Sequence, residues 1–173
     1  PEVLGRLKVA NQAHVPPLQP CGELQTFGAR SFSIWQADTG RLVYDSGNQF
    51  EVMTAQVHGA SFNQGDKRSD DRGPEPEALA LGRLAQHDYA FIGMERAAGI
   101  AVYDISEPER ARFASYNTPV GMHVGLESMV FIPAQHNPVG RPLIAAAYEY
   151  SRSVVVYEVV RVQRDSEPVK LGQ

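Results

Sequence analysis

The chain of 173 residues is long enough for one folded domain with a substantial core, because a domain usually contains roughly 100–200 residues. Hydrophobic residues make up 43% of the sequence and charged residues 21%, which excludes a disordered tail and a fibrous repeat. The 15 glycines and 12 prolines indicate many turns and few long helices. We therefore expect a mainly β structure.

The charge balance narrows the classes of partner. The 16 Lys and Arg residues are outnumbered by 20 Asp and Glu residues, and no segment concentrates basic side chains, so we expect no nucleic-acid partner. The longest apolar runs, at residues 143–148 and 154–157, are far shorter than the roughly 20 residues that cross a bilayer, so we expect no membrane span. The sequence starts at Pro1 without Met or a leader, which we interpret as a processed or trimmed chain.

An internal repeat is the main organising feature of the sequence. Residues 77–104 resemble residues 127–158 after an interval of 50 to 54 residues, and the extra residues of the second copy fall in a turn. A period of about 40–50 residues is typical of β-propeller blades, which are four-stranded sheets around a central axis. The aligned pairs are Glu77 with Glu127, Glu95 with Glu149, and Tyr103 with Tyr157.

A third, weaker copy lies upstream of these two. Residues 31–36 share the alternating pattern of residues 99–104, which aligns Trp35 with Tyr103. The turn Asp38-Thr39-Gly40 then predicts a hairpin, because Asp bonds the turn backbone and Gly tolerates a positive φ. Each copy is expected to contain three or four short strands.

These patterns predict one all-β domain, a propeller-like array of three to four blades. Residues 75–86 contain good helix formers, but their partner in the repeat is typical of a strand, so we favour a strand there. The predicted boundaries are a single domain over 1–173, blades at 24–58, 77–118 and 127–162, and loops at 11–22 and 59–76.

The densest group of charged residues precedes the second blade, where residues 68–77 contain four carboxylates. Calcium prefers about six to eight oxygen ligands, and a proline-stiffened acidic loop presents several of them at small entropic cost. The alternative is a solvated loop whose own arginines, Arg68 and Arg72, neutralise the acids. The carboxylates concerned are Asp70, Asp71, Glu75 and Glu77.

The repeated glutamates form a second candidate site. Inner strands line the central channel of a propeller, so Glu77 and Glu127 are expected to converge at the axis. Converging carboxylates repel one another, and a divalent cation or an added proton relieves the repulsion. The pattern places Glu95 and Glu149 after the middle strand, near a blade edge. The alternative for all four is a hydrogen bond to the backbone of a neighbouring blade.

A further set of segments carries a likeness to known proteins, namely residues 28–35, 37–40, 43–47, 68–77, 89–96, 99–105 and 125–127. In these segments the sequence resembles the bacterial choice-of-anchor I family of exported β-propeller proteins, often described as alkaline-phosphatase-like or phytase-like. The resemblance implies an extracytoplasmic propeller that a separate anchor ties to the cell surface. Two departures are residues 12–21, which lack the acidic, calcium-loop-like segment often found in the family, and Ala78, where the family has glycine. The resemblance extends over about residues 4–160.

Two functions follow as hypotheses. The first is an exported or cell-surface module with a binding or scaffolding role for an unidentified ligand, holding a divalent cation such as calcium. The alternative is a calcium-dependent phosphoesterase, in which metal ions activate water and cationic side chains contact phosphate. No motif for nucleophilic catalysis is present, so catalytic residues stay unassigned. The predicted metal ligands are Asp70, Asp71, Glu75, Glu77 and Glu127, and the predicted ligand contacts are Arg68, Arg72, Glu95, Arg96 and Glu149.

The chain length conflicts with a closed ring. At about 40–45 residues per blade, the 173 residues amount to roughly four blades, the lower limit for a propeller, and the repeat accounts for three. We therefore expect a fragment or a shortened member that forms an open array. Its edges are expected to be covered by loops, by a second copy in a homo-oligomer, or by the remainder of a longer propeller.

Overall fold

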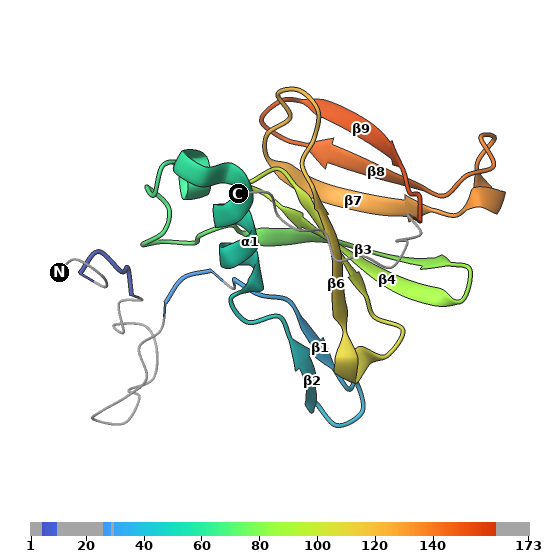
Figure 1. Ribbon diagram of the computed structural model, residues 1–173, viewed down its shortest axis with the longest axis horizontal. Helices are drawn as coiled ribbons and strands as arrows, with labels where there is room; N and C mark the ends of the chain where they lie inside the picture. Colours follow the sequence, from blue (N-terminus) through green and yellow to red (C-terminus); the bar gives the residue numbers. More distant parts are fainter. Residues whose placement is uncertain (1–4, 10–25, 29, 162–173) are drawn as a thin grey trace.

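The computed structural model describes residues 5–9, 26–28 and 30–161. In this part of the chain three antiparallel β-sheets and one α-helix form the fold, which confirms the mainly β prediction (Figure 1). The first sheet pairs β1 (Ser33–Trp35) with β2 (Leu42–Asp45). The second contains β3 (Pro76–Leu84), β4 (His87–Met94), β5 (Ile100–Asp104) and β6 (Arg112–Asn117), and the third contains β7 (Leu126–Ile132), β8 (Leu143–Tyr148) and β9 (Ser153–Glu158).

The second and third sheets repeat one another down to an irregularity in their inner strands. In β3 the pairing with β4 shifts register between Pro76 and Ala78, so Glu77 has no partner residue. In β7 the pairing with β8 shifts at the aligned place and leaves Glu127 unpaired. Both residues therefore occupy β-bulges, which bend a strand and redirect a side chain.

The weaker first copy is also visible in the structure. The pairing of β1 with β2 shifts register between Ile34 and Trp35, and the pairing of β5 with β6 shifts between the aligned Val102 and Tyr103. The first sheet thus corresponds to the two outer strands of the second. The strand predicted within residues 75–86 is β3, and the loop predicted at 11–22 lies outside the described residues.

The first copy departs from the prediction of three or four strands. It has two strands and continues into α1 (Gln49–His58) and the 3-10 helix η2 (Gly59–Gln64), across the boundary predicted between blade and loop. Phe50 and Thr54 lie four residues apart, on one face of α1, and both are buried. The Phe50 ring packs edge-on to Tyr103, so the helix covers part of the second sheet.

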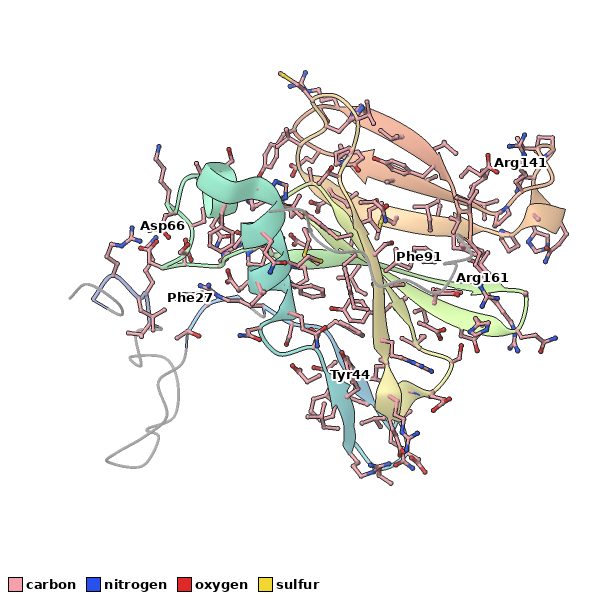
Figure 2. All side chains as sticks on the ribbon, viewed as in Figure 1. Phe27, Tyr44, Asp66, Phe91, Arg141 and Arg161 are labelled. Atoms are coloured by element: carbon pink, nitrogen blue, oxygen red, sulfur yellow. The ribbon has the colours of Figure 1, made fainter. Side chains whose placement is uncertain are left out.

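The second sheet is apolar on both faces and packs against a neighbour on each. On one face Phe91, labelled in Figure 2, stacks on Phe131 of the third sheet with ring centroids 5.9 Å apart. On the other face Tyr103 packs against Phe32 at 4.7 Å and against Phe50. The three sheets therefore stack in chain order, and the described residues form an open, propeller-like array rather than a closed barrel.

The third sheet approaches the second closely at Gly82, where an added Cβ would lie 2.5 Å from the Phe131 ring. No helix in the described ranges is long and apolar enough to span a membrane.

The substitution Gly82→Ala is expected to destabilise the protein by about 1–3 kcal/mol, because the methyl group would force the Phe131 ring away. Alanine also restricts the unfolded chain, an effect that alone would stabilise the protein, so a net loss reports the clash. Denaturant unfolding of both proteins measures the difference. In a Phe131→Leu background the cost should shrink, and an equal cost in both backgrounds would contradict the contact.

Candidate functional site

Five glutamates from the second and third sheets gather where β3 and β7 begin. We call them the glutamate cluster. They form two groups of three that share Glu95, and within each group one carboxylate oxygen per residue lies within 4.8 Å of the others. The first group is Glu75, Glu77 and Glu95, and the second is Glu95, Glu127 and Glu149.

The repeat places these side chains. Glu77 and Glu127 project from the two bulges, while Glu95 and Glu149 directly follow β4 and β8. The structure therefore brings Glu95 and Glu149 into the same site as the inner-strand glutamates, although the sequence pattern placed them near a blade edge.

Glu75 stands in an unusual backbone conformation. Its φ is +53°, and Gly125, which occupies the aligned position before β7, has a φ of +77°. The two carbonyls have matching roles, since Glu75 accepts from the Glu95 amide at 2.9 Å and Gly125 accepts from the Glu149 amide at 2.7 Å. A left-handed conformation costs a non-glycine residue on the order of 1 kcal/mol, so the second sheet carries a strained acidic residue where the third has glycine.

Two guanidinium groups hold the Glu75 carboxylate. Arg68 donates to its Oε1 through both Nε and Nη2, and Arg96 Nε lies 3.4 Å from its Oε2. Burial raises the pKa of Glu75, but hydrogen bonds with Glu95 and Arg68 and the charges of both arginines outweigh this effect. The net result lowers the pKa below its usual 4.5, so Glu75 stays ionised.

Glu95 behaves in the opposite way. It is only 4% exposed, and this burial, followed by hydrogen bonds with Glu75 and Glu77, raises its pKa to about 7. Arg96, at 2.8 Å, acts against the rise without cancelling it. The cluster therefore retains a proton on Glu95 up to about neutral pH, which relieves the repulsion among its carboxylates.

Tyr150 completes the site and was not recognised in the sequence. Its hydroxyl accepts from Arg96 Nη1 at 2.7 Å and donates to Glu95 at 3.3 Å, and its ring centroid lies 5.1 Å from the Arg96 guanidinium carbon. The available signal was its place in the repeat, because Tyr150 follows Glu149 as Arg96 follows Glu95. Aligned positions of the two copies thus contact each other.

The remaining residues of the acidic loop lie elsewhere. The Asp71 carboxylate pairs with Lys8 at 3.2 Å and lies 4.0 Å from Arg72. The Asp70 backbone carbonyl accepts from the Lys8 amide at 2.8 Å. Neither aspartate belongs to the two carboxylate groups, whereas Arg68 and Arg96 both reach the cluster.

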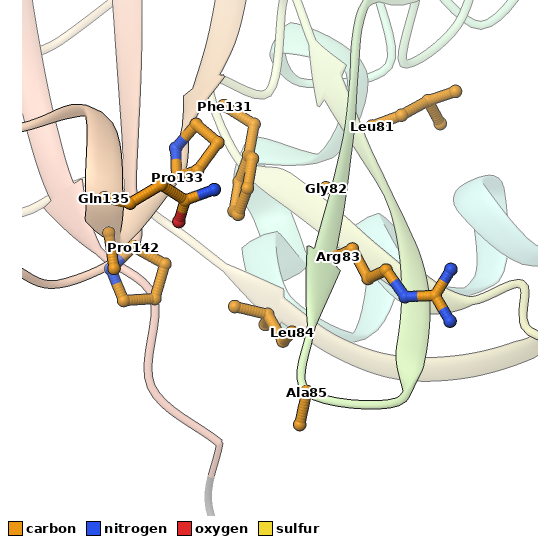
Figure 3. Close-up of a pocket in the computed structure, with 10 residues that line it drawn as sticks. Leu81, Gly82, Arg83, Leu84, Ala85, Phe131, Pro133, Gln135 and Pro142 are labelled. Atoms are coloured by element: carbon orange, nitrogen blue, oxygen red, sulfur yellow. The ribbon is translucent and has the colours of Figure 1, made fainter.

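One cavity lies beside the site and another lies away from it. A small one of about 160 Å³ adjoins Arg96 and is lined by polar side chains of α1 and η2, among them His58 and Asn63. A larger one of about 520 Å³ lies at the far ends of β3 and β7, away from the glutamates (Figure 3). Its lining is mainly apolar and holds no carboxylate, with Phe131 and Leu84 on facing sides. The ionisable side chains of the site therefore lie beside the smaller cavity, and the larger cavity is separate from them.

The fold and the site define an incomplete propeller-type module with an acidic cluster between its blades. The chain belongs to the choice-of-anchor I domain family, whose model matches residues 1–108, and this confirms the resemblance seen in the sequence. Membership indicates a cell-surface module.

Two curated proteins are similar to this chain. Gigasin-3a from Magallana gigas is 24% identical over 184 residues, which cover 91% of this chain and 65% of that protein. The mesenchyme-specific cell surface glycoprotein of Strongylocentrotus purpuratus is 27% identical over 113 residues, which cover 53% of this chain and 14% of that protein. The chain thus spans less than two thirds of either relative. No solved structure gives a significant match.

Glu95→Gln is expected to flatten the pH dependence of stability between pH 4.5 and about 7. In this window the folded protein keeps a proton on Glu95 that the unfolded chain has released. The stabilising contribution is therefore complete below 4.5 and is lost as the pH rises through about 7. The lowered pKa of Glu75 acts with the opposite sign and below this window.

Because Gln resembles the protonated acid, the variant should melt about 2–4 °C above the wild type near pH 8. Thermal melts across the pH range measure both effects. Glu109→Gln, at an exposed acid outside the cluster, serves as the control. Parallel pH profiles for the wild type and Glu95→Gln would contradict the assignment.

Proposed function

We propose that this chain is an extracytoplasmic, cell-surface binding module that holds a divalent cation, with calcium as the first candidate, in the glutamate cluster. The observation that carries the proposal is the meeting of five carboxylates from two repeats around the buried Glu95. The relative from Strongylocentrotus purpuratus is named as a cell surface glycoprotein, which supports a surface location for this chain as well.

The second group is the better cation site. Glu75 in the first group is already neutralised by Arg68 and Arg96. Glu127 and Glu149 are exposed, and no described residue forms an ion pair with either. Oxygens within 4.8 Å of one another suit a calcium ion, whose ligand distances are about 2.3–2.6 Å. The cation would therefore lie between Glu95, Glu127 and Glu149, with water completing the coordination.

Cation binding at this place is coupled to a proton. A metal ion needs the ionised carboxylate, so binding displaces the proton that Glu95 holds below about pH 7. The affinity for the cation should therefore rise as the pH increases from 6 to 8. Below the pKa of Glu95 the rise is up to about tenfold per pH unit, because binding displaces one proton.

The arginines favour binding over phosphoester hydrolysis. A phosphoesterase of this kind needs a cationic group free to contact phosphate near the metal. Arg96 is engaged by Glu75, Glu95 and Tyr150, and Arg68 is engaged by Glu75. Hydrolysis of p-nitrophenyl phosphate or phytate with added calcium, abolished by Glu127→Gln, would overturn a purely binding role.

Calcium titration by calorimetry and by melting tests the cation site. Saturating calcium should raise the melting temperature, since about 100-fold excess over Kd adds about 2.7 kcal/mol, and a chelator should reverse the rise. Glu127→Gln and Glu149→Gln should each weaken binding by about tenfold or more. Glu109→Gln is the control for charge alone, and Asp71→Asn tests the acidic loop. Failure of the wild type to bind calcium at about 1 mM, the range of weak extracellular sites, would exclude the proposal.

A further inference from the structure

We propose that two copies of this chain assemble head to tail through the two end faces of the sheet stack. The faces belong to the first and the third sheet. We call them the Trp35 face (Ser33, Trp35, Leu42 and Asp45, the cross-strand partner of Ser33) and the Val154 face (Ser128, Val130, Ala145, Ala147, Val154 and Val156). The argument rests on the repeat and on side-chain exposure, and is independent of the cation site.

The Val154 face repeats a surface that is covered elsewhere in the same chain. The third sheet packs on one face of the second sheet, where the contacting residues are buried or nearly so. At the aligned positions the third sheet carries a similar apolar surface, but Val154 is 70% exposed, and Val130 and Val156 are more than half exposed. The covered positions are Ala78, Ala80, Phe91, Ile100 and Val102, which align with Ser128, Val130, Ala145, Val154 and Val156.

The Trp35 face repeats the opposite surface. Tyr103 and Tyr157 align with Trp35, and each packs on the sheet that precedes its own. Tyr103 is fully buried against Phe32 of the first sheet, and Tyr157 packs into the core between the second and third sheets. Trp35 stands in the first sheet and is 58% exposed, because no described sheet precedes it.

The two faces therefore form the two halves of a junction that the chain already makes twice. At each internal junction an aromatic residue of one sheet packs on the apolar face of the preceding sheet. The Val154 face is suited to a larger aromatic residue, since Ala145 stands where the second sheet has Phe91. The Trp35 indole is larger than the aligned tyrosines, so it fits this smaller surface.

A second copy is the partner that supplies both halves. A heterologous contact between unlike faces either closes into a ring or continues as a filament. Two copies with three sheets each close the ring when both junctions form. Burial of apolar side chains drives such association, and about 25 cal/mol is gained for each Å² of apolar surface removed from water.

Trp35 makes the contact measurable, because it is the single tryptophan of the chain. Sedimentation velocity of the whole chain from about 1 to 200 µM, the range of weak to moderate affinities, should show the mass doubling from 19.0 kDa. Over the same range the tryptophan emission should shift to the blue as the indole leaves water. A mass that stays at 19.0 kDa with unshifted emission would overturn the proposal, and would leave both faces for blades of a longer polypeptide.

Variants on exposed positions test each face without disturbing the core. Val154→Lys and Trp35→Ser should each weaken association at least about tenfold. Val139→Lys adds the same charge in the turn between β7 and β8, where valine is 55% exposed, and should leave association unchanged. Circular dichroism verifies that all three variants fold. Association that survives both face variants would overturn the proposal.

Mixing the two variants tests the polarity of the contact. A chain with Trp35→Ser keeps its Val154 face, and a chain with Val154→Lys keeps its Trp35 face. The mixture should therefore associate through one intact junction more strongly than either variant alone. No recovery on mixing would indicate that like faces pair with each other, and would overturn the head-to-tail arrangement.

Discussion

The structure depends on one constraint, which is that the second sheet is apolar on both faces and needs a neighbour on each. On one side the small residues Ala78, Ala80 and Gly82 let the third sheet approach until Phe131 lies over the glycine. On the other side Tyr103 requires the aromatic cluster of the first sheet and α1. A sheet of this kind gains stability from hydrophobic burial rather than from its hydrogen bonds alone. The order of the stack follows from this requirement.

The same packing creates the acidic site. Glu95 comes from the second sheet, and Glu127 and Glu149 come from the third, so their carboxylates meet because the sheets dock in repeat register. Docking also removes Glu95 from water, which is the largest cause of its raised pKa. The contact of Arg96 with Tyr150 spans the same junction and supplies a positive charge among the acids. Core packing and site electrostatics are thus two results of one interface.

The sequence predicted the features that repeat and missed those that arise between repeats. Alternation and the 50 to 54 residue interval located the strands of both larger sheets and paired Glu77 with Glu127. Helix α1 was not predicted, since a buried pair such as Phe50 and Thr54 is too short a pattern to establish a helical period. The central position of Glu95 and its contact with Tyr150 depend on how two sheets meet, which no local pattern encodes.

The two bulges separate the chemistry of the site from the architecture that carries it. Glu77 and Glu127 are the extra residues of their strands, so neither takes part in the alternation that directs neighbouring side chains toward the core. Replacing either acid leaves every other residue of the strand facing as before. The same pair of strands can therefore present different side chains at positions 77 and 127 without a change in strand register. Divergence of ligand preference in such a module does not require any change in how the blades stack.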